Sequence, residues 1–191
     1  MTNTLNAAHT ALRTTLAAVP QDGWTRPTPC EHWNVTQVLQ HATGDQQAYA
    51  SFITGEPGPD FNPFDPSGTL SENPLEFAER AMTASAGAWD SVGDDVQDAP
   101  TPLPQGKMPK WLGAGAAALD AGVHAWDIAV ATGQASPLTP ELSRELLVVA
   151  KEIVEPLRQY GAYAAALEPQ EGDDDTAALL RYLGRNPAWT A

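Results

Sequence analysis

The sequence predicts an all-α fold, a four-helix bundle with additional helices at its C-terminal end. Apolar residues recur every three or four positions through most of the 191 residues, as they do on the buried face of a helix. No stretch shows the apolar–polar alternation of a half-buried β-strand, and no internal repeat is present. Long amphipathic helices separated by Pro- and Gly-rich breaks are typical of antiparallel bundles. We therefore expect residues 1–191 to form a single helical domain.

The first two helices are marked by their ends. The first runs from about Thr4 to Val19, where apolar residues recur at helical spacing until Pro20 interrupts them. The second begins after Asn34, which has the side chain of a good N-cap and is followed three residues later by glutamine, as in a capping box. We expect it to end near Gly55.

Two Pro-rich loops, residues 55–73 and 93–109, enclose the third predicted helix. That helix opens at Pro74, which follows an asparagine suited to capping, and proline is favoured at the first helical position. Long loops are often functional. Phe61 and Phe64 in the first loop either cover the mouth of a site or pin the loop to the body of the protein.

The remaining helices complete the bundle. The fourth is predicted over residues 110–132, with Gly133 as its C-terminal cap. A fifth opens at a Thr-Pro-Glu sequence and covers about residues 139–160. A short last helix is predicted over about residues 176–183 and ends at Gly184.

Three residues of the predicted bundle are candidate metal ligands. Asp120 and His124 are four residues apart in the fourth predicted helix, so their side chains leave the same face. His41 lies about two turns into the second predicted helix. Three such ligands leave coordination positions open for water or substrate. The spacing leaves a second interpretation open, in which Asp120 and His124 form only an ion pair or a hydrogen bond.

Composition excludes several classes of partner. Lysine and arginine number 10 against 24 acidic residues, a formal net charge of -14, which disfavours nucleic acids and anionic membrane surfaces. Cys30 is the only cysteine, so an intramolecular disulfide cannot form, as expected in a reducing compartment. We find no signal peptide and no apolar run long enough to span a bilayer. We therefore expect a cytoplasmic protein.

Three sequence motifs resemble a known family. Residues 27–35 read PTPCEHWNV and residues 38–41 read VLQH, which together resemble the opening motif of the DinB/YfiT-like metalloproteins. Residues 123–134, VHAWDIAVATGQ, resemble a motif of the branch that includes mycothiol-dependent maleylpyruvate isomerase. The ending LGRNPAW at residues 183–189 is similar to the tail of that branch's small single-domain members. The resemblance spans the chain from end to end.

The resemblance implies a DinB-like four-helix bundle that holds a divalent metal, zinc or nickel, between facing helices. It implies that His41, Asp120 and His124 are the metal ligands, in agreement with their spacing. Several members are thiol S-transferases or thiol-dependent isomerases that use low-molecular-weight thiols such as mycothiol. A Lewis-acidic cation lowers the pKa of such a thiol, and the thiolate then attacks an electrophile.

The implied function is that of a metal-binding, thiol-dependent S-transferase or isomerase, whose partners are a thiol such as mycothiol and a small electrophile. Two alternatives stay open: metal-dependent hydrolysis at the same cation, and a non-catalytic metal-bound bundle that binds a small molecule or a partner. Because related bundles often dimerise, a homodimer is a further expectation. No catalytic or cofactor-binding residue is assigned.

Several other polar residues have more than one interpretation. Asp127 either orients His124, binds metal, or pairs with an arginine to join two helices. Asp45 either supports His41 or is solvated. Cys30 is expected to be structural, and His9 to face solvent or the rim of the bundle. The arginines without an assigned role are Arg144, Arg158, Arg181 and Arg185.

Overall fold

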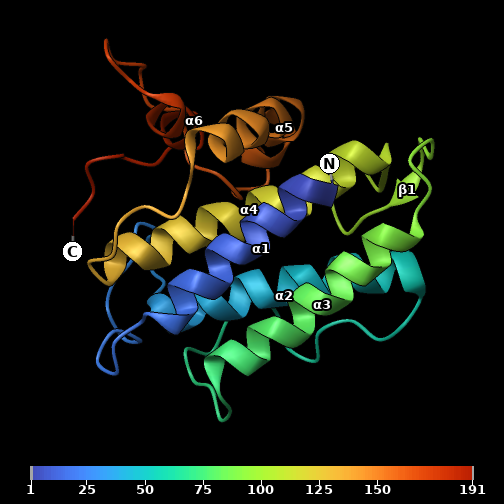
Figure 1. Ribbon diagram of the computed structural model, residues 1–191, viewed down its shortest axis with the longest axis horizontal. Coiled ribbons are helices and arrows are strands. Elements are labelled where there is room, and N and C mark those ends of the chain that lie inside the picture. The colour runs from blue at the N-terminus through green and yellow to red at the C-terminus, as the bar shows by residue number, and fades with distance from the viewer. Residues whose placement is uncertain (1, 191) are drawn as a thin grey trace.

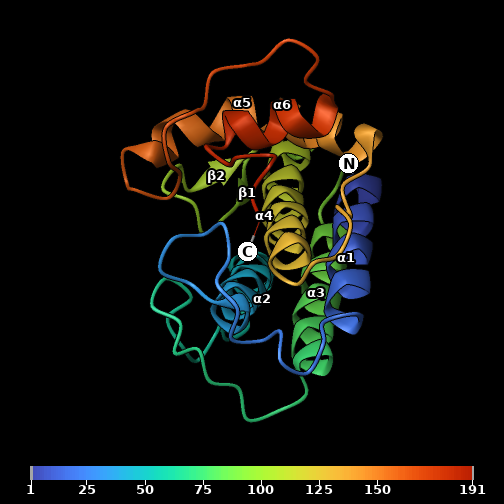
Figure 2. The same ribbon diagram turned by 90° about the vertical axis from the view of Figure 1, so that its left-hand side faces the viewer.

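Four long helices lie side by side in the computed structural model, which describes residues 2–190 (Figures 1 and 2). They are α1 (Thr2–Ala17), α2 (Val35–Thr54), α3 (Pro74–Ser91) and α4 (Lys110–Ala131). Two further helices, α5 (Pro140–Arg158) and α6 (Asp175–Tyr182), run across one side of this bundle, and α5 packs on α4 and α1. The predicted all-α bundle with additional C-terminal helices is confirmed.

The end of α1 and one loop differ from the prediction. Helix α1 ends at Ala17 because the chain tightens there, and the Val19 N–H bonds back only three residues, to the carbonyl of Leu16 at 3.3 Å. In the second Pro-rich loop, β1 (Ala99–Pro100) pairs antiparallel with β2 (Lys107–Met108). Strands of two residues are too short to show an alternating pattern.

The capping box that begins α2 sets the position of His41 in the bundle. The backbone N–H of Gln37 donates to Asn34 Oδ1 at 3.0 Å, and the backbone N–H of Asn34 donates to Gln37 Oε1 at 3.0 Å. These two bonds satisfy free donors at the helix start. Gly55 ends the helix in the left-handed conformation, with φ 77°, as predicted.

Helix α4 is the central helix and is buried along nearly its whole length. Small residues allow its neighbours to approach closely. A Cβ atom added at Gly113 would lie 2.3 Å from the Trp89 ring of α3, and one at Gly115 would lie 2.6 Å from a methyl group of Val149 in α5. The polar side chains that α4 carries in its second half are therefore held in the interior, where each needs a partner.

The loop over residues 55–73 lies against α2, and its two phenylalanines have different roles. Phe61 packs against Phe77 of α3, with ring centroids 5.9 Å apart, and so pins the loop to the bundle. Phe64 is 68% exposed, yet the edge of its ring meets the ring of His41 at 5.4 Å between centroids. The second interpretation, in which the loop is pinned to the body, therefore applies to Phe61, whereas Phe64 lies against a candidate ligand.

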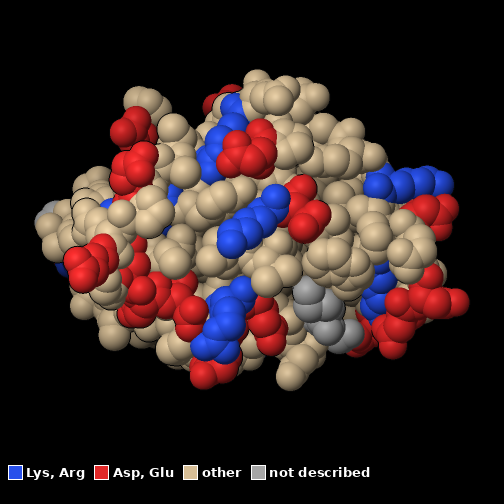
Figure 3. Space-filling view, turned by 90° about the horizontal axis from the view of Figure 1, so that it is seen from above, with Lys and Arg blue, Asp and Glu red and all other residues tan. Residues whose placement is uncertain are grey.

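The surface carries both signs of charge. On the face shown in Figure 3, basic side chains lie beside acidic ones and no continuous basic area is seen. Several basic groups are paired: Arg13 contacts Glu79 at 2.7 Å, and Lys110 at the start of α4 contacts Asp94 at 2.8 Å. Within residues 2–190, no helix combines the length and apolarity needed to cross a membrane.

Candidate metal centre

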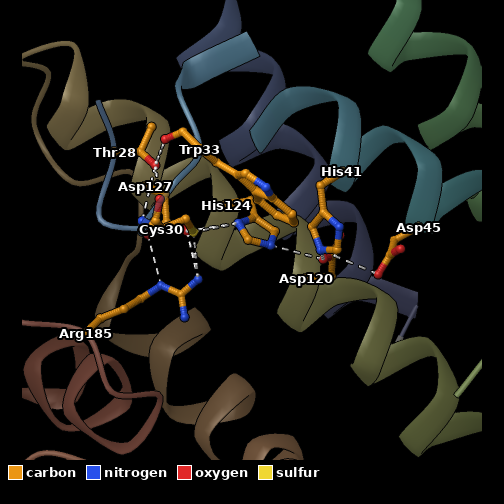
Figure 4. A network of polar contacts seen from close by, with 9 residues as sticks. All are labelled: Thr28, Cys30, Trp33, His41, Asp45, Asp120, His124, Asp127 and Arg185. Atoms are coloured by element: carbon orange, nitrogen blue, oxygen red, sulfur yellow. Dashed lines mark hydrogen bonds and ion pairs between the residues drawn. The ribbon is translucent and has the colours of Figure 1, made fainter. Parts of the chain in front are cut away.

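The three predicted ligands meet where α2 faces α4 (Figure 4). The Nε2 atom of His41 lies 3.6 Å from Oδ1 of Asp120, and the Nε2 atom of His124 lies 3.4 Å from the same oxygen. One ligand atom from each residue falls within 4.8 Å of the other two. Two ligands about 2.1 Å from one zinc ion at a tetrahedral angle would lie about 3.4 Å apart, so these separations suit a shared ion.

The orientation of His41 is fixed by the loop that covers α2. Its Nδ1 lies 2.9 Å from the carbonyl oxygen of Pro63, and because a carbonyl only accepts, Nδ1 carries the proton. Gly44, one turn further along α2, allows the loop to come this close, since a Cβ atom there would lie 2.7 Å from that of Pro63. In a neutral ring, Nε2 then carries no proton, and its lone pair faces Asp120.

The orientation of His124 is fixed from its own helix. Its Nδ1 lies 2.9 Å from Oδ2 of Asp127, one turn away on α4. Arg185 binds both oxygens of this carboxylate, so Asp127 is an acceptor and His124 Nδ1 is the donor. The Nε2 atom of His124 therefore also presents a lone pair to Asp120.

The two Nε2 atoms and Oδ1 of Asp120 thus face one another with lone pairs and without a donated hydrogen. In addition, Oδ2 of Asp120 is buried and has no hydrogen-bond partner among the described residues. Burial, and then the negative charge of Asp45, raise the pKa of Asp120 well above its ordinary value, while burial lowers the pKa of His124 to about 4. A cation held between the three atoms would offset the cost of burying an ionised Asp120. The donor set and its unbalanced lone pairs fit a divalent cation.

A second cluster shares His124 and lies beside the first (Figure 4). The thiol of Cys30 donates to Asp127 Oδ2 at 3.1 Å. Arg185 donates from Nε to Asp127 Oδ1 at 2.9 Å and from a terminal nitrogen to Oδ2 at 2.8 Å. Cys30, His124 and Asp127 also lie within ligand distance of one another. This cluster contains a cation already, namely the guanidinium.

In the second cluster, the charge of Asp127 is balanced by the charge of Arg185. Burial and the neighbouring Asp127 carboxylate raise the pKa of the Cys30 thiol, so the sulfur stays protonated and donates a hydrogen bond. Burial alone would raise the pKa of Asp127, but the charge of Arg185 and the bond from His124 outweigh it and hold that pKa below its ordinary value. A structural role for Cys30, as predicted, agrees with these contacts.

Two residues near the triad of His41, Asp120 and His124 had only weak signals in the sequence. Oδ2 of Asp45 lies 3.9 Å from Nε2 of His41, the nitrogen that faces the triad. Its position one turn after His41 is the signal that was available. Burial and the charge of Asp120 raise the pKa of Tyr163, so its phenol stays protonated. Tyr163 follows α5 in a turn, where no periodicity relates it to the site.

Other polar residues correct or refine the sequence-based interpretation. His9 was expected to face solvent or the rim of the bundle and is instead buried, with Nε2 2.9 Å from Oε1 of Gln46. Gln46 in turn donates to the carbonyl of Ala117 in α4 at 2.9 Å. Two of the interpretations of Asp127 hold together, because it both accepts from His124 and pairs with Arg185.

Known proteins resemble this chain in sequence and in fold. The sequence model of the mycothiol maleylpyruvate isomerase N-terminal domain matches residues 5–129. Two uncharacterized proteins of Mycobacterium tuberculosis, from strains CDC 1551 / Oshkosh and ATCC 25618 / H37Rv, are each 30% identical over 181 residues, which cover 93% of this chain and 93% of each relative. The matched family range includes all three residues of the triad.

The fold is similar to that of two solved structures. They are crystal structures of the mycothiol-dependent maleylpyruvate isomerase, one of them of a histidine-to-alanine mutant. Each has a TM-score of 0.61, and the alignment covers 87% of this chain and 73% of the isomerase. Sequence identity is 17% and 18%, so these two likenesses establish the fold.

Proposed function

The chain belongs to the mycothiol maleylpyruvate isomerase N-terminal domain family, and from that premise we propose that it is a metal- and thiol-dependent enzyme. The reaction proposed is S-transfer to, or isomerisation of, a small electrophile, with mycothiol as the thiol and zinc or nickel as the metal. Because low-molecular-weight thiols are kept reduced in the cytoplasm, that is the proposed compartment. Residues 1–191 would act as a single metal-binding domain.

The state of Asp120 is the observation that carries this proposal. A buried carboxylate normally has hydrogen-bond donors or a cation beside it. Within residues 2–190, Asp120 instead has one oxygen without a hydrogen-bond partner. The other oxygen lies between two imidazole nitrogens whose lone pairs point at it. Maintaining such an arrangement is costly without a ligand. His41, Asp120 and His124 are therefore the residues that we propose hold the metal.

The chain's own residues divide the remaining tasks. A divalent cation, when bound, supplies Lewis acidity that lowers the pKa of a thiol. The rings of Trp33 and Phe64 flank His41, at 4.8 and 5.4 Å between centroids, and form an apolar wall on that side. The protonated phenol of Tyr163 is a donor suited to orienting a polar group of the thiol or the electrophile.

Metal content and thiol turnover test the proposal together. Protein purified without a histidine tag or added metal is analysed for its elements and then mixed with mycothiol and monochlorobimane. We expect about one zinc or nickel ion per chain, and conjugation faster than in the protein-free mixture. The His124→Ala variant is the matched control and should lose both. Metal without turnover would leave a binding protein, and the absence of metal after reconstitution would overturn the proposal.

An acid beside the triad supports a second candidate function, metal-dependent hydrolysis. Asp45 lies 3.9 Å from Nε2 of His41, within reach of a water molecule held near the three ligands. A carboxylate there is suited to accept a proton from water, whereas a thiol of lowered pKa needs no such acceptor. In the Asp45→Asn variant, ester hydrolysis should fall if the protein is a hydrolase, while bimane conjugation should persist if it is a transferase.

A further inference from the structure

We propose that Arg185 is a positioning residue for the metal centre, acting on His124 through Asp127. The inference rests on the proposed function, since it concerns a ligand of the same site. Arg185 lies beyond residues 5–129, the range matched by the family. The C-terminal segment would thus complete a metal site whose ligands all come from the bundle.

The hydrogen bonds of Asp127 carry the first step. Its side chain is fully buried, and each of its contacts to a polar group comes from a donor: two from Arg185, one from the Cys30 thiol and one from His124. With Arg185 bound to both oxygens, the carboxylate has only acceptor capacity for the imidazole. His124 must then place its proton on Nδ1 and its lone pair on Nε2, which is the form that binds a metal.

The path of the chain carries the second step, because it holds Arg185 in place. Gly184 has φ 78°, and a Cβ atom there would lie 2.8 Å from both Ala164 Cβ and the Ala165 carbonyl oxygen. Arg158 of α5 donates to the carbonyls of Ala164 and Tyr182 and so ties the two segments together. The sharp turn at Gly184 directs Arg185 from the end of α6 towards α4 (Figure 4).

A purely structural role for the same ion pair makes a different prediction. A pair that only joins the C-terminal segment to α4 would affect stability and leave the imidazole proton of His124 where it is. A positioning role requires that proton to move when the pair is broken. The tautomer of His124 in the metal-free protein therefore separates the two roles without any need for metal or turnover.

The first experiment records ¹⁵N shifts of the histidine rings in metal-free protein. Wild type should show His124 as the Nδ1–H tautomer. In Arg185→Gln and Asp127→Asn we expect the Nε2–H form to become populated, while Arg185→Lys, which keeps the charge but not the two-point contact, should lie between. Far-UV circular dichroism establishes that each variant is folded. An unchanged tautomer in folded Arg185→Gln would overturn the inference.

The second experiment measures zinc affinity by competition with a chromophoric chelator, and the visible absorption of the cobalt form. We expect a loss of about 10- to 100-fold in Arg185→Gln, the usual effect of removing a group that supports a metal-bound histidine. Arg181→Gln is the matched control: it breaks a pair with Asp173 at 3.0 Å in the same C-terminal segment. That variant should keep wild-type affinity and absorption.

The two proposals fail in different ways. Wild-type protein that binds neither zinc nor cobalt would overturn the proposed function, and the tautomer experiment would still test Arg185. Wild-type binding with equal affinity in Arg185→Gln and Arg181→Gln would overturn only the inference about Arg185. Equal losses in both variants would also overturn it, because they would show a general effect of loosening the segment.

Discussion

The two clusters that share His124 are built from similar residues but differ in how their charges are balanced. In the cluster around Asp127, Cys30 and His124 donate hydrogen bonds to the carboxylate, and Arg185 supplies a positive charge. Around Asp120, two imidazole lone pairs face the carboxylate, and its second oxygen finds no hydrogen-bond partner in the part of the chain that the structure describes. The first cluster is complete as it stands, whereas the second needs a cation or a proton.

This difference shows why ligand spacing alone does not identify a metal site. Both clusters bring three ligand atoms within 4.8 Å of one another. In the Cys30 cluster the guanidinium of Arg185 competes with a cation for Asp127, and a thiol of raised pKa is a poor ligand. The difference lies in the hydrogen bonds, and it is the reason why we propose the metal for the triad and a supporting role for its neighbour.

Removing a ligand is the largest change that can break this comparison. We expect His41→Ala to lose stoichiometric zinc or nickel, because two ligands in a partly buried site cannot compensate for the third. Cys30→Ser, in the other cluster, should retain the metal. Elemental analysis after dialysis measures both, and circular dichroism should show unchanged helical content. Metal retained in His41→Ala and His124→Ala alike would contradict the assignment, as would its loss in Cys30→Ser.

The same substitution in the two clusters should have opposite effects on the metal-free protein. Asp127→Asn removes the partner of a buried guanidinium, and we expect the free energy of unfolding to fall by about 3–5 kcal/mol. Asp120→Asn replaces a carboxyl group whose ionised form burial disfavours with an uncharged amide that can donate to an imidazole. There we expect a gain of about 1–3 kcal/mol.

Urea denaturation in the presence of a chelator measures both changes. With excess zinc, the wild type should become more stable than Asp120→Asn, because only the wild type then gains the free energy of zinc binding. If Asp120→Asn lowered the stability of the metal-free protein as much as Asp127→Asn does, the two carboxylates would be equally well satisfied. The distinction between the clusters would then be wrong.

The sequence contains enough information for the bundle and for the triad. Helix boundaries follow from apolar spacing and from caps such as Asn34 and Gly55, which act locally. Asp120 and His124 are one turn apart on α4, so any helix there brings them together. His41 could be joined to them only by the expectation that metal sites of a bundle lie between facing helices and by the family resemblance, since spacing within one helix says nothing of the facing helix.

The supporting groups could not be predicted in the same way. The partner of His41 is the carbonyl of Pro63, a backbone atom in a loop, and it leaves no trace in residue type. Arg185 is 58 positions from Asp127, and its place in the LGRNPAW motif gave no indication of its partner. His9 was misplaced because its partner, Gln46, lies on another helix. These contacts depend on tertiary packing, which no local pattern encodes.

The substitution Gly44→Ala tests whether the hydrogen bond from His41 to the Pro63 carbonyl positions this ligand. The new Cβ would lie 2.7 Å from Pro63 Cβ, so the loop must move and weaken the bond that orients His41. We expect zinc affinity to fall by about 10-fold. Gly87→Ala is the control, because its Cβ would meet nothing within 4 Å, and it should add stability without changing affinity. Equal affinities in the two variants would show that the Pro63 carbonyl does not position the ligand.

His9 provides a smaller test, as a buried histidine whose partners are complete. Burial lowers its pKa from 6.5, so below that pH the unfolded chain binds a proton that the folded chain excludes. The stability contributed by neutral His9 is therefore present above pH 6.5 and is lost as the pH falls from 7 to 5, by at most about 1.4 kcal/mol per pH unit. His9→Gln keeps a donor for Gln46 but does not titrate. The difference in unfolding free energy between wild type and His9→Gln should shrink or reverse with acidification, and a difference that is constant over this range would show that His9 is protonated alike in both states.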